Sequence, residues 1–133
     1  MVSTTLKRTE HGEQAYVIQW ARTNAYREPA LNYLFAIANG ARLSHRMSQN
    51  GTHYSPEANK LRSEGMLAGV PDLCLPAARR GYNGLYIEMK IGKNKTSEQQ
   101  DAVIKYLREA GYQVEVCYGG DKAVEVLIFY LGL

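Results

Sequence analysis

Apolar residues recur every three to four positions in several parts of the chain, which is the spacing of one face of a helix. Residues that favour the start of a helix precede two of these parts, and a glycine follows the end of each of the two. We expect helices at residues 10–24, 56–64, 98–110 and 121–133. The last of these, DKAVEVLIFYLGL, is strongly apolar and predicts a core helix, with a contact in a dimer as the alternative.

Shorter apolar or alternating runs predict four strands. They lie near 33–38 and at Val70–Leu75, Leu85–Lys90 and Tyr112–Tyr118. The turn sequence GYNG joins the second run to the third, so we expect these two strands to pair as a hairpin. The polar stretch at 41–54 has no period, which predicts a loop, and its role stays open.

Helices and strands therefore alternate along the chain, and this order predicts an α/β layer fold with one mixed sheet. A length of 133 residues suits a single domain over 1–133. No apolar run approaches the roughly 20 residues needed to cross a bilayer. The first residues, MVSTTLKRTEHGEQ, lack the apolar segment of a secretion signal, so we expect a cytoplasmic protein without a membrane partner.

Composition changes this picture only slightly. The formal net charge of +3 indicates a weak preference for polyanionic partners, and basic residues gather in the middle of the chain. Four of them are candidates for phosphate contacts, with an ordinary solvated surface as the alternative: Arg42, Arg46, Lys93 and Lys95. Cys74 and Cys117 lie in apolar runs without ligand spacing, which predicts reduced core residues.

Three charged residues stand inside the predicted hairpin, where an apolar interior penalises them unless each is paired or binds a metal. Glu88 and Lys90 share one face of their strand because side chains alternate. A near-symmetric hairpin places Asp72 beside Glu88. Two carboxylates that close repel each other, and a divalent cation such as Mg²⁺ relieves the repulsion.

Lys90 completes a candidate hydrolytic site. Its amine can hold or deprotonate an attacking water and offset charge that builds on a phosphate. The alternative is a silent salt bridge between Glu88 and Lys90 on an exposed strand. That alternative fits poorly, because Leu85, Ile87 and Met89 mark a strand that is apolar on its other positions.

A longer frame surrounds these residues. It consists of Asn39-Gly40, SEGMLAGVPDLCLP at 63–76, GLYIEMK at 84–90, SEQQ before a helix, and GYQVEV at 111–116. In this order the segments resemble the VRR-NUC family of the PD-(D/E)xK nuclease superfamily, in the compact stand-alone form often found in phages. The resemblance covers roughly residues 10–118. It implies a restriction-endonuclease-like core of order αβββαβ, here followed by a C-terminal helix.

The resemblance also implies roles for individual residues. Asp72 and Glu88 would be the principal metal ligands, the Met89 backbone carbonyl a third ligand, and Lys90 the catalytic lysine. Two further residues are candidates for catalysis, and each has an alternative nearby. Glu13, which would also be a metal ligand, has Glu10 as its alternative, and Gln100 has Gln99. Glu13 would aim a carboxylate at the metal from the first helix, and Gln100 would orient the lysine or the scissile phosphate.

For function, the resemblance implies an endonuclease that uses Mg²⁺ or Mn²⁺ to hydrolyse DNA phosphodiesters. By analogy the substrate would be branched DNA, such as a four-way junction or a flap, and a homodimer would suit a two-fold junction. Two alternatives stay open. One is a catalytically silent nucleic-acid-binding module, and the other is an accessory protein of a phage replication or packaging complex.

Overall fold

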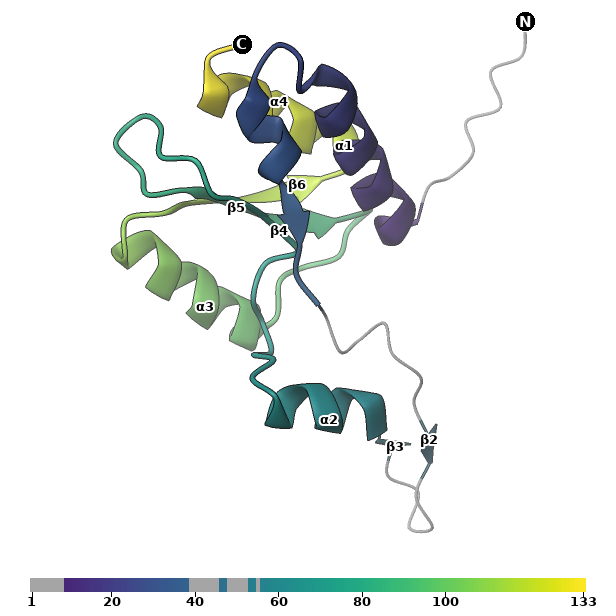
Figure 1. The fold of residues 1–133 in the computed structure, drawn as a ribbon. Coiled ribbons are helices and arrows are strands. Elements are labelled where there is room, and N and C mark those ends of the chain that lie inside the picture. The colour runs from purple at the N-terminus through teal and green to yellow at the C-terminus, as the bar shows by residue number, and fades with distance from the viewer. Residues whose placement is uncertain (1–8, 39–45, 48–52, 55) are drawn as a thin grey trace, which may run out of the picture.

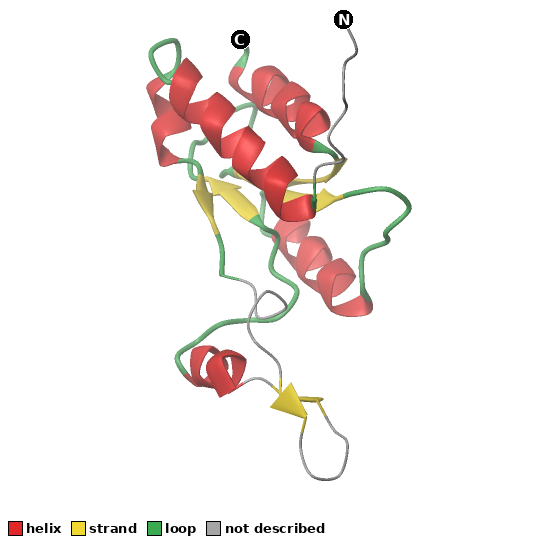
Figure 2. Ribbon diagram, turned by 90° about the vertical axis from the view of Figure 1, so that its right-hand side faces the viewer, coloured by secondary structure: helices red, strands yellow, loops and turns green. Residues whose placement is uncertain are grey.

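The computed structural model describes residues 9–38, 46–47, 53–54 and 56–133. Figure 1 shows three layers, with a central sheet, helices α1 and α4 on one face, and helix α3 on the other. This is the predicted α/β architecture with one mixed sheet. Helix α2 and the short β2–β3 pair lie away from these layers in both ribbon views (Figures 1 and 2).

The central sheet has four strands in the order β1-β4-β5-β6, and it is mixed. The strands are β1 (Phe35–Ala36), β4 (Leu73–Leu75), β5 (Leu85–Lys90) and β6 (Gln113–Tyr118). Strands β1, β4 and β5 pair antiparallel, whereas β5 and β6 run parallel. The parallel pair brings the carboxyl ends of β5 and β6 to the same edge of the sheet.

The four predicted helices are all present, with ends within a few residues of the expected positions. They are α1 (Glu10–Asn24), α2 (Pro56–Ser63), α3 (Glu98–Glu109) and α4 (Gly120–Leu131). The longest has 15 residues, which corresponds to roughly 22 Å of helix. Across the described part of the chain, no helix has both the length and the apolar character needed to span a bilayer.

Two predicted strands were too long. Pro29 starts a 3₁₀ helix, η1 (Pro29–Tyr33), which takes up the first residue of the expected run at 33–38, and two residues of that run form β1. The strand expected at Val70–Leu75 is reduced to β4, because Pro71 has no N–H to donate to a ladder. The expected loop at 41–54 lies mostly outside the described residues, but it includes the paired strands β2 (Arg46–Met47) and β3 (His53–Tyr54).

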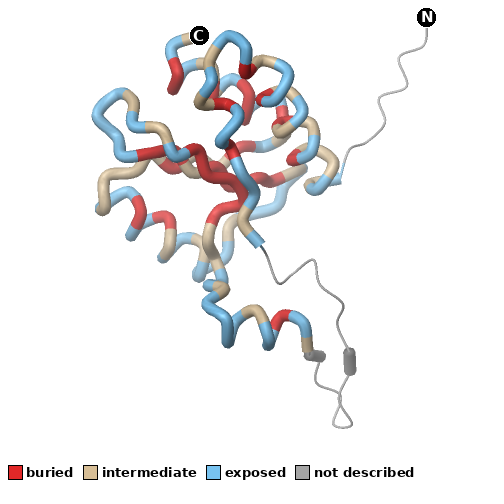
Figure 3. Tube along the Cα trace, viewed as in Figure 1, coloured by how far each residue is buried: buried red, intermediate tan, exposed pale blue. Residues whose placement is uncertain are grey.

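Both faces of the sheet are packed, and buried positions run along the strands in Figure 3. The larger core lies between the sheet and helices α1 and α4. Its strand residues include Leu73, Leu85, Ile87 and Met89, each with zero exposure. A smaller cluster on the other face joins α3 to β6. The two charged residues of β5, Glu88 and Lys90, lie at the alternate positions of the strand and therefore face the α3 layer.

Helices α1 and α4 are joined by a close contact at Gly120. The first N–H of α4, on Gly120, donates to Glu13 Oε2 at 2.8 Å. A Cβ at this position would lie 2.5 Å from Tyr16 Cδ1 and 2.8 Å from the same carboxylate oxygen. Because α4 has no side-chain cap of its own, Glu13 supplies the acceptor that its N-terminus needs.

The two cysteines are buried, and neither is in a disulfide, as the sequence predicted. Burial raises the pKa of the Cys117 thiol to about 12 and also raises the pKa of Cys74. Both thiols therefore stay protonated near neutral pH, and they act as small apolar core residues.

Candidate active site

Two carboxylates meet at the start of β4, beside β5. Leu73 lies opposite Ile87 in the hairpin, so the same register places Asp72 opposite Glu88, as the sequence predicted. Asp72 is 2% exposed and Glu88 is 1% exposed. Asp72 Oδ2 accepts a hydrogen bond of 2.8 Å from the Met89 N–H, which fixes the carboxylate beside β5.

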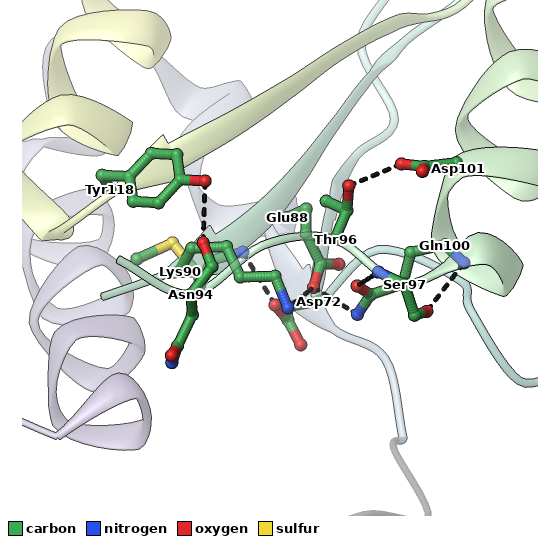
Figure 4. Close-up of polar contacts among 10 residues, drawn as sticks. Asp72, Glu88, Lys90, Asn94, Thr96, Ser97, Gln100, Asp101 and Tyr118 are labelled. Atoms are coloured by element: carbon green, nitrogen blue, oxygen red, sulfur yellow. Dashed lines mark hydrogen bonds and ion pairs between the residues drawn. The ribbon is translucent and has the colours of Figure 1, made fainter. Parts of the chain in front are cut away.

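Lys90 and Gln100 converge on one oxygen of Glu88 (Figure 4). Gln100 Nε2 donates to Glu88 Oε1 at 2.8 Å, and Lys90 Nζ lies 3.6 Å from the same oxygen. Lys90 is nearly buried, at 9% exposure. Glu88 and Lys90 therefore form a shielded ion pair at the site, and the exposed salt bridge considered above does not occur.

The start of α3 holds Gln100 in place. Ser97 Oγ accepts from the Gln100 N–H at 3.1 Å, and Gln100 Oε1 accepts from the Ser97 N–H at 2.9 Å. This capping box occupies the amide oxygen, so the amide nitrogen is directed at Glu88. The structure thus brings Gln100 to the site, while Gln99 is an exposed residue of the same turn.

The second oxygen of Glu88 is in a different situation. Oε2 is buried, and it finds no hydrogen-bond partner among the described residues. Burial and the nearby charge of Asp72 raise the pKa of Glu88 to about 7, and Lys90 only partly opposes this. A buried carboxylate oxygen without a partner is costly unless a proton or a cation occupies it.

The first turn of α1 carries two acidic residues, Glu10 and Glu13. The charge of Glu10 contributes to the raised pKa of Glu88. The Glu13 carboxylate instead accepts from Gly120 at the start of α4. Glu13 thus serves the packing of α1 against α4, and Glu10, the alternative that the sequence left open, is the acidic residue of α1 whose charge acts on Glu88.

The residues present fit a hard divalent cation. Asp72 and Glu88 offer two adjacent carboxylates, one with an unpartnered oxygen. The Met89 N–H points toward Asp72, so the carbonyl of the same residue points to the same side of β5. In the described residues, no three Asp, Glu, His or Cys side chains gather closely enough to hold a metal alone. Mg²⁺ needs only one or two carboxylates, because waters and phosphate oxygens complete its shell.

The basic residues proposed for DNA contacts are only partly described. Lys93 and Lys95 are exposed on the loop that leaves β5 directly after Lys90. Arg42 lies outside the described residues, and Arg46 is placed only as a backbone position in β2. The structure thus brings two of the four candidates to the edge of the sheet that carries the site.

Comparison with known proteins agrees with this geometry. The family model of the VRR-NUC domain matches residues 7–121. The chain belongs to the VRR-NUC family. A solved structure described as a VRR_NUC domain protein shares 27% sequence identity with a TM-score of 0.72, over 94% of this chain and 89% of that chain. No curated protein matches the chain.

The VRR-NUC assignment identifies the fold as one of nuclease type, and the resemblance seen in the sequence is confirmed. Sequence reasoning missed two features of the site. The hydrogen bond from Gly120 to Glu13 was not foreseen, because this partner of Glu13 is 107 positions away along the chain. The pairing of Tyr118 with Lys90 at the ends of β6 and β5 was also not foreseen, because it depends on the parallel register of two strands that a helix separates.

The raised pKa of Glu88 predicts how stability depends on pH without metal. The folded pKa of about 7 exceeds the ordinary 4.5, so the stabilisation from protonated Glu88 is complete below pH 4.5 and is lost as pH rises through 7. Relative to Glu88→Gln, the free energy of unfolding of the native chain should fall by up to about 1.4 kcal/mol per pH unit in this window. Urea unfolding in EDTA between pH 4.5 and 8 measures this difference. A difference that does not change with pH would contradict the assignment.

Proposed function

We propose that this VRR-NUC protein is an endonuclease that hydrolyses DNA phosphodiester bonds with the help of Mg²⁺ or Mn²⁺. The observation that carries the proposal is the buried, unpartnered Oε2 of Glu88 beside Asp72. A salt bridge kept only for stability would leave no such oxygen, because burying it without a partner destabilises the fold. A cation between the two carboxylates removes that cost.

Asp72, Glu88 and the Met89 carbonyl would hold the cation, with Glu10 facing it from α1. When bound, the cation lowers the pKa of a coordinated water and neutralises charge on the phosphate. The hydrogen bond from Met89 fixes Asp72, and the one from Gln100 fixes Glu88. These contacts pre-orient the carboxylates, so little reorganisation is needed when DNA arrives.

Lys90 performs the step that the carboxylates cannot. Its amine shares the face of Glu88 and carries three donors, so it can hold the attacking water in line with the phosphorus and donate to a phosphate oxygen. The water attacks phosphorus and gives up one proton to solvent, the bond to the 3′ oxygen breaks, and that oxygen takes one proton from solvent. The expected ends are a 5′-phosphate and a 3′-hydroxyl.

The two acidic residues in the first turn of α1 should have different effects when each is replaced by glutamine. Glu10→Gln should lower the cleavage rate by about ten- to a hundredfold, because it weakens the metal site. Glu13→Gln should leave kcat close to the native value and lower the melting temperature, since the Gly120 N–H then faces a neutral acceptor. Cleavage kinetics and thermal unfolding of both variants measure this. The opposite ranking in kcat would restore Glu13 as the metal-facing residue.

Branched DNA, such as a four-way junction or a flap, is the proposed substrate class, and a homodimer is the proposed form. Support for the dimer comes from α4. It buries Leu127 and Tyr130 in the core, yet it leaves Phe129 62% exposed, with the Arg80 guanidinium 4.0 Å from the ring centroid. A second copy that covers Phe129 would remove this apolar surface from water.

Labelled duplex, flap and four-way junction DNA, each incubated with the purified protein and Mg²⁺ or Mn²⁺, test the proposal. Cleavage that stops in EDTA is expected, with the branched substrates cut fastest. Tight DNA binding without metal-stimulated cleavage would contradict an enzyme and favour a silent binding module. A stable protein partner without affinity for DNA would instead favour an accessory protein.

A further inference from the structure

The loop between β5 and α3, residues 91–97, leaves the sheet directly beside the catalytic lysine. Lys90 is the last residue of β5 and Tyr118 the last of β6, and the two are paired in register. The Gly119 N–H donates to the Lys90 carbonyl at 2.9 Å, so the parallel ladder continues to the point where the loop begins. Tyr118 therefore stands on the same face of the sheet as Lys90.

The loop is held at its middle by Tyr118. The Tyr118 hydroxyl donates to the Asn94 carbonyl at 2.8 Å, across 24 positions of the chain, as Figure 4 shows. The far end of the loop is held separately, because Thr96 Oγ1 lies 2.5 Å from Asp101 Oδ1. Lys93 and Lys95 flank the residue that Tyr118 holds, and both are exposed.

We propose that Tyr118 is a positioning residue, whose hydroxyl fixes the loop so that Lys93 and Lys95 contact DNA phosphates beside the bond that Lys90 acts on. The proposal rests on the nuclease function proposed above. Long lysine side chains on a free loop lose entropy when they bind, and a loop fixed in advance lowers that cost. Tyr118 thus acts on substrate binding, and Lys90, held by the sheet itself, keeps its chemical role.

Tyr118→Phe removes one hydroxyl and keeps the ring, so it isolates this hydrogen bond. In full-length protein we expect trypsin to cut after Lys93 and Lys95 about two- to tenfold faster, which corresponds to one lost neutral hydrogen bond. Cutting after Lys60 in α2 should not change, and it serves as the internal control in the same digest. This readout does not depend on whether the protein cleaves DNA.

The second readout is the division between KM and kcat for cleavage of DNA. Tyr118→Phe should raise KM by about two- to tenfold with kcat nearly unchanged. In a Lys93→Ala/Lys95→Ala background, it should have no further effect on KM, because the loop then has no phosphate contacts to lose. Tyr106→Phe, on an exposed tyrosine of α3, is the matched control and should change neither digestion nor KM.

Three results would overturn the proposal. Unchanged tryptic cutting of Tyr118→Phe would show that the hydroxyl does not hold the loop. A KM effect that persists without the two lysines would show that Tyr118 acts in another way. A native protein that neither binds nor cuts DNA would refute the nuclease function itself, and the tryptic digest would still show separately whether Tyr118 holds the loop.

Discussion

Cleavage of DNA by Glu88→Gln or Lys90→Met should be slower than that of the native protein by about 10²- to 10³-fold in kcat. Glu88→Gln keeps the shape of the side chain and removes the charge that would hold a cation. Lys90→Met keeps most of the buried stem and removes the donor 3.6 Å from Glu88. Single-turnover cleavage of a labelled junction or flap, with DNA in excess of its Kd, measures the loss directly.

Lys105→Met is the control for the lysine. Lys105 has a 78% exposed side chain on α3, and its ion pair with Glu109 spans 3.9 Å. An exposed pair of this kind contributes little, so this variant should cleave at the native rate. If Glu88→Gln and Lys90→Met also cleaved at the native rate, the reaction would have to take place elsewhere on the protein.

The second large effect is expected at Gly69, which lies where the segment before β4 passes the start of α3. Gly69 has a φ of +92°, and a Cβ there would lie 2.6 Å from the carbonyl oxygen of Gln99. The backbone of α3 cannot move out of the way as a flexible side chain can. Gly69→Ala should therefore displace the first turn of α3 and move Gln100 away from Glu88. We expect a loss of about 2–4 kcal/mol in the free energy of unfolding, from steric overlap and left-handed strain together.

Gly65→Ala separates these two causes. Gly65 also has a positive φ, of +112°, but its Cβ would meet nothing within 4 Å. Gly65→Ala should therefore lower the free energy of unfolding only through backbone strain, by about 1–2 kcal/mol, and should leave the cleavage rate unchanged. Urea unfolding and cleavage kinetics of the two variants provide the comparison. Equal losses in both would mean that Gly69 does not position α3.

The sequence was sufficient for the parts of the fold that depend on local patterns. The alternation in Leu85–Lys90 and the GYNG turn predicted the hairpin register that brings Asp72 to Glu88. Ser97 indicated the start of a helix, and the preference for the glutamine three positions later agrees with the capping box that forms there. Both features depend on residues close in sequence or on one short turn, so their geometry could be derived.

Contacts between distant segments could not be derived in this way. Nothing near Glu13 indicates that its carboxylate will accept the first N–H of α4, because that partner is brought near only when α1 and α4 pack together. The close approach of Gly69 to α3 is likewise a tertiary feature. Strand lengths were overestimated, since the 3₁₀ helix that Pro29 starts takes up Tyr33, and Pro71 has no N–H to donate to a ladder.

The central claim is that Asp72 and Glu88 share a divalent cation. A crystal structure with Mn²⁺, with anomalous scattering to locate the ion, tests it most directly. The account predicts an anomalous peak between the two carboxylates, in contact with Glu88 Oε2, that is absent in Glu88→Gln. A site that stays empty at saturating Mn²⁺, with Lys90 bonded to both oxygens of Glu88, would contradict it.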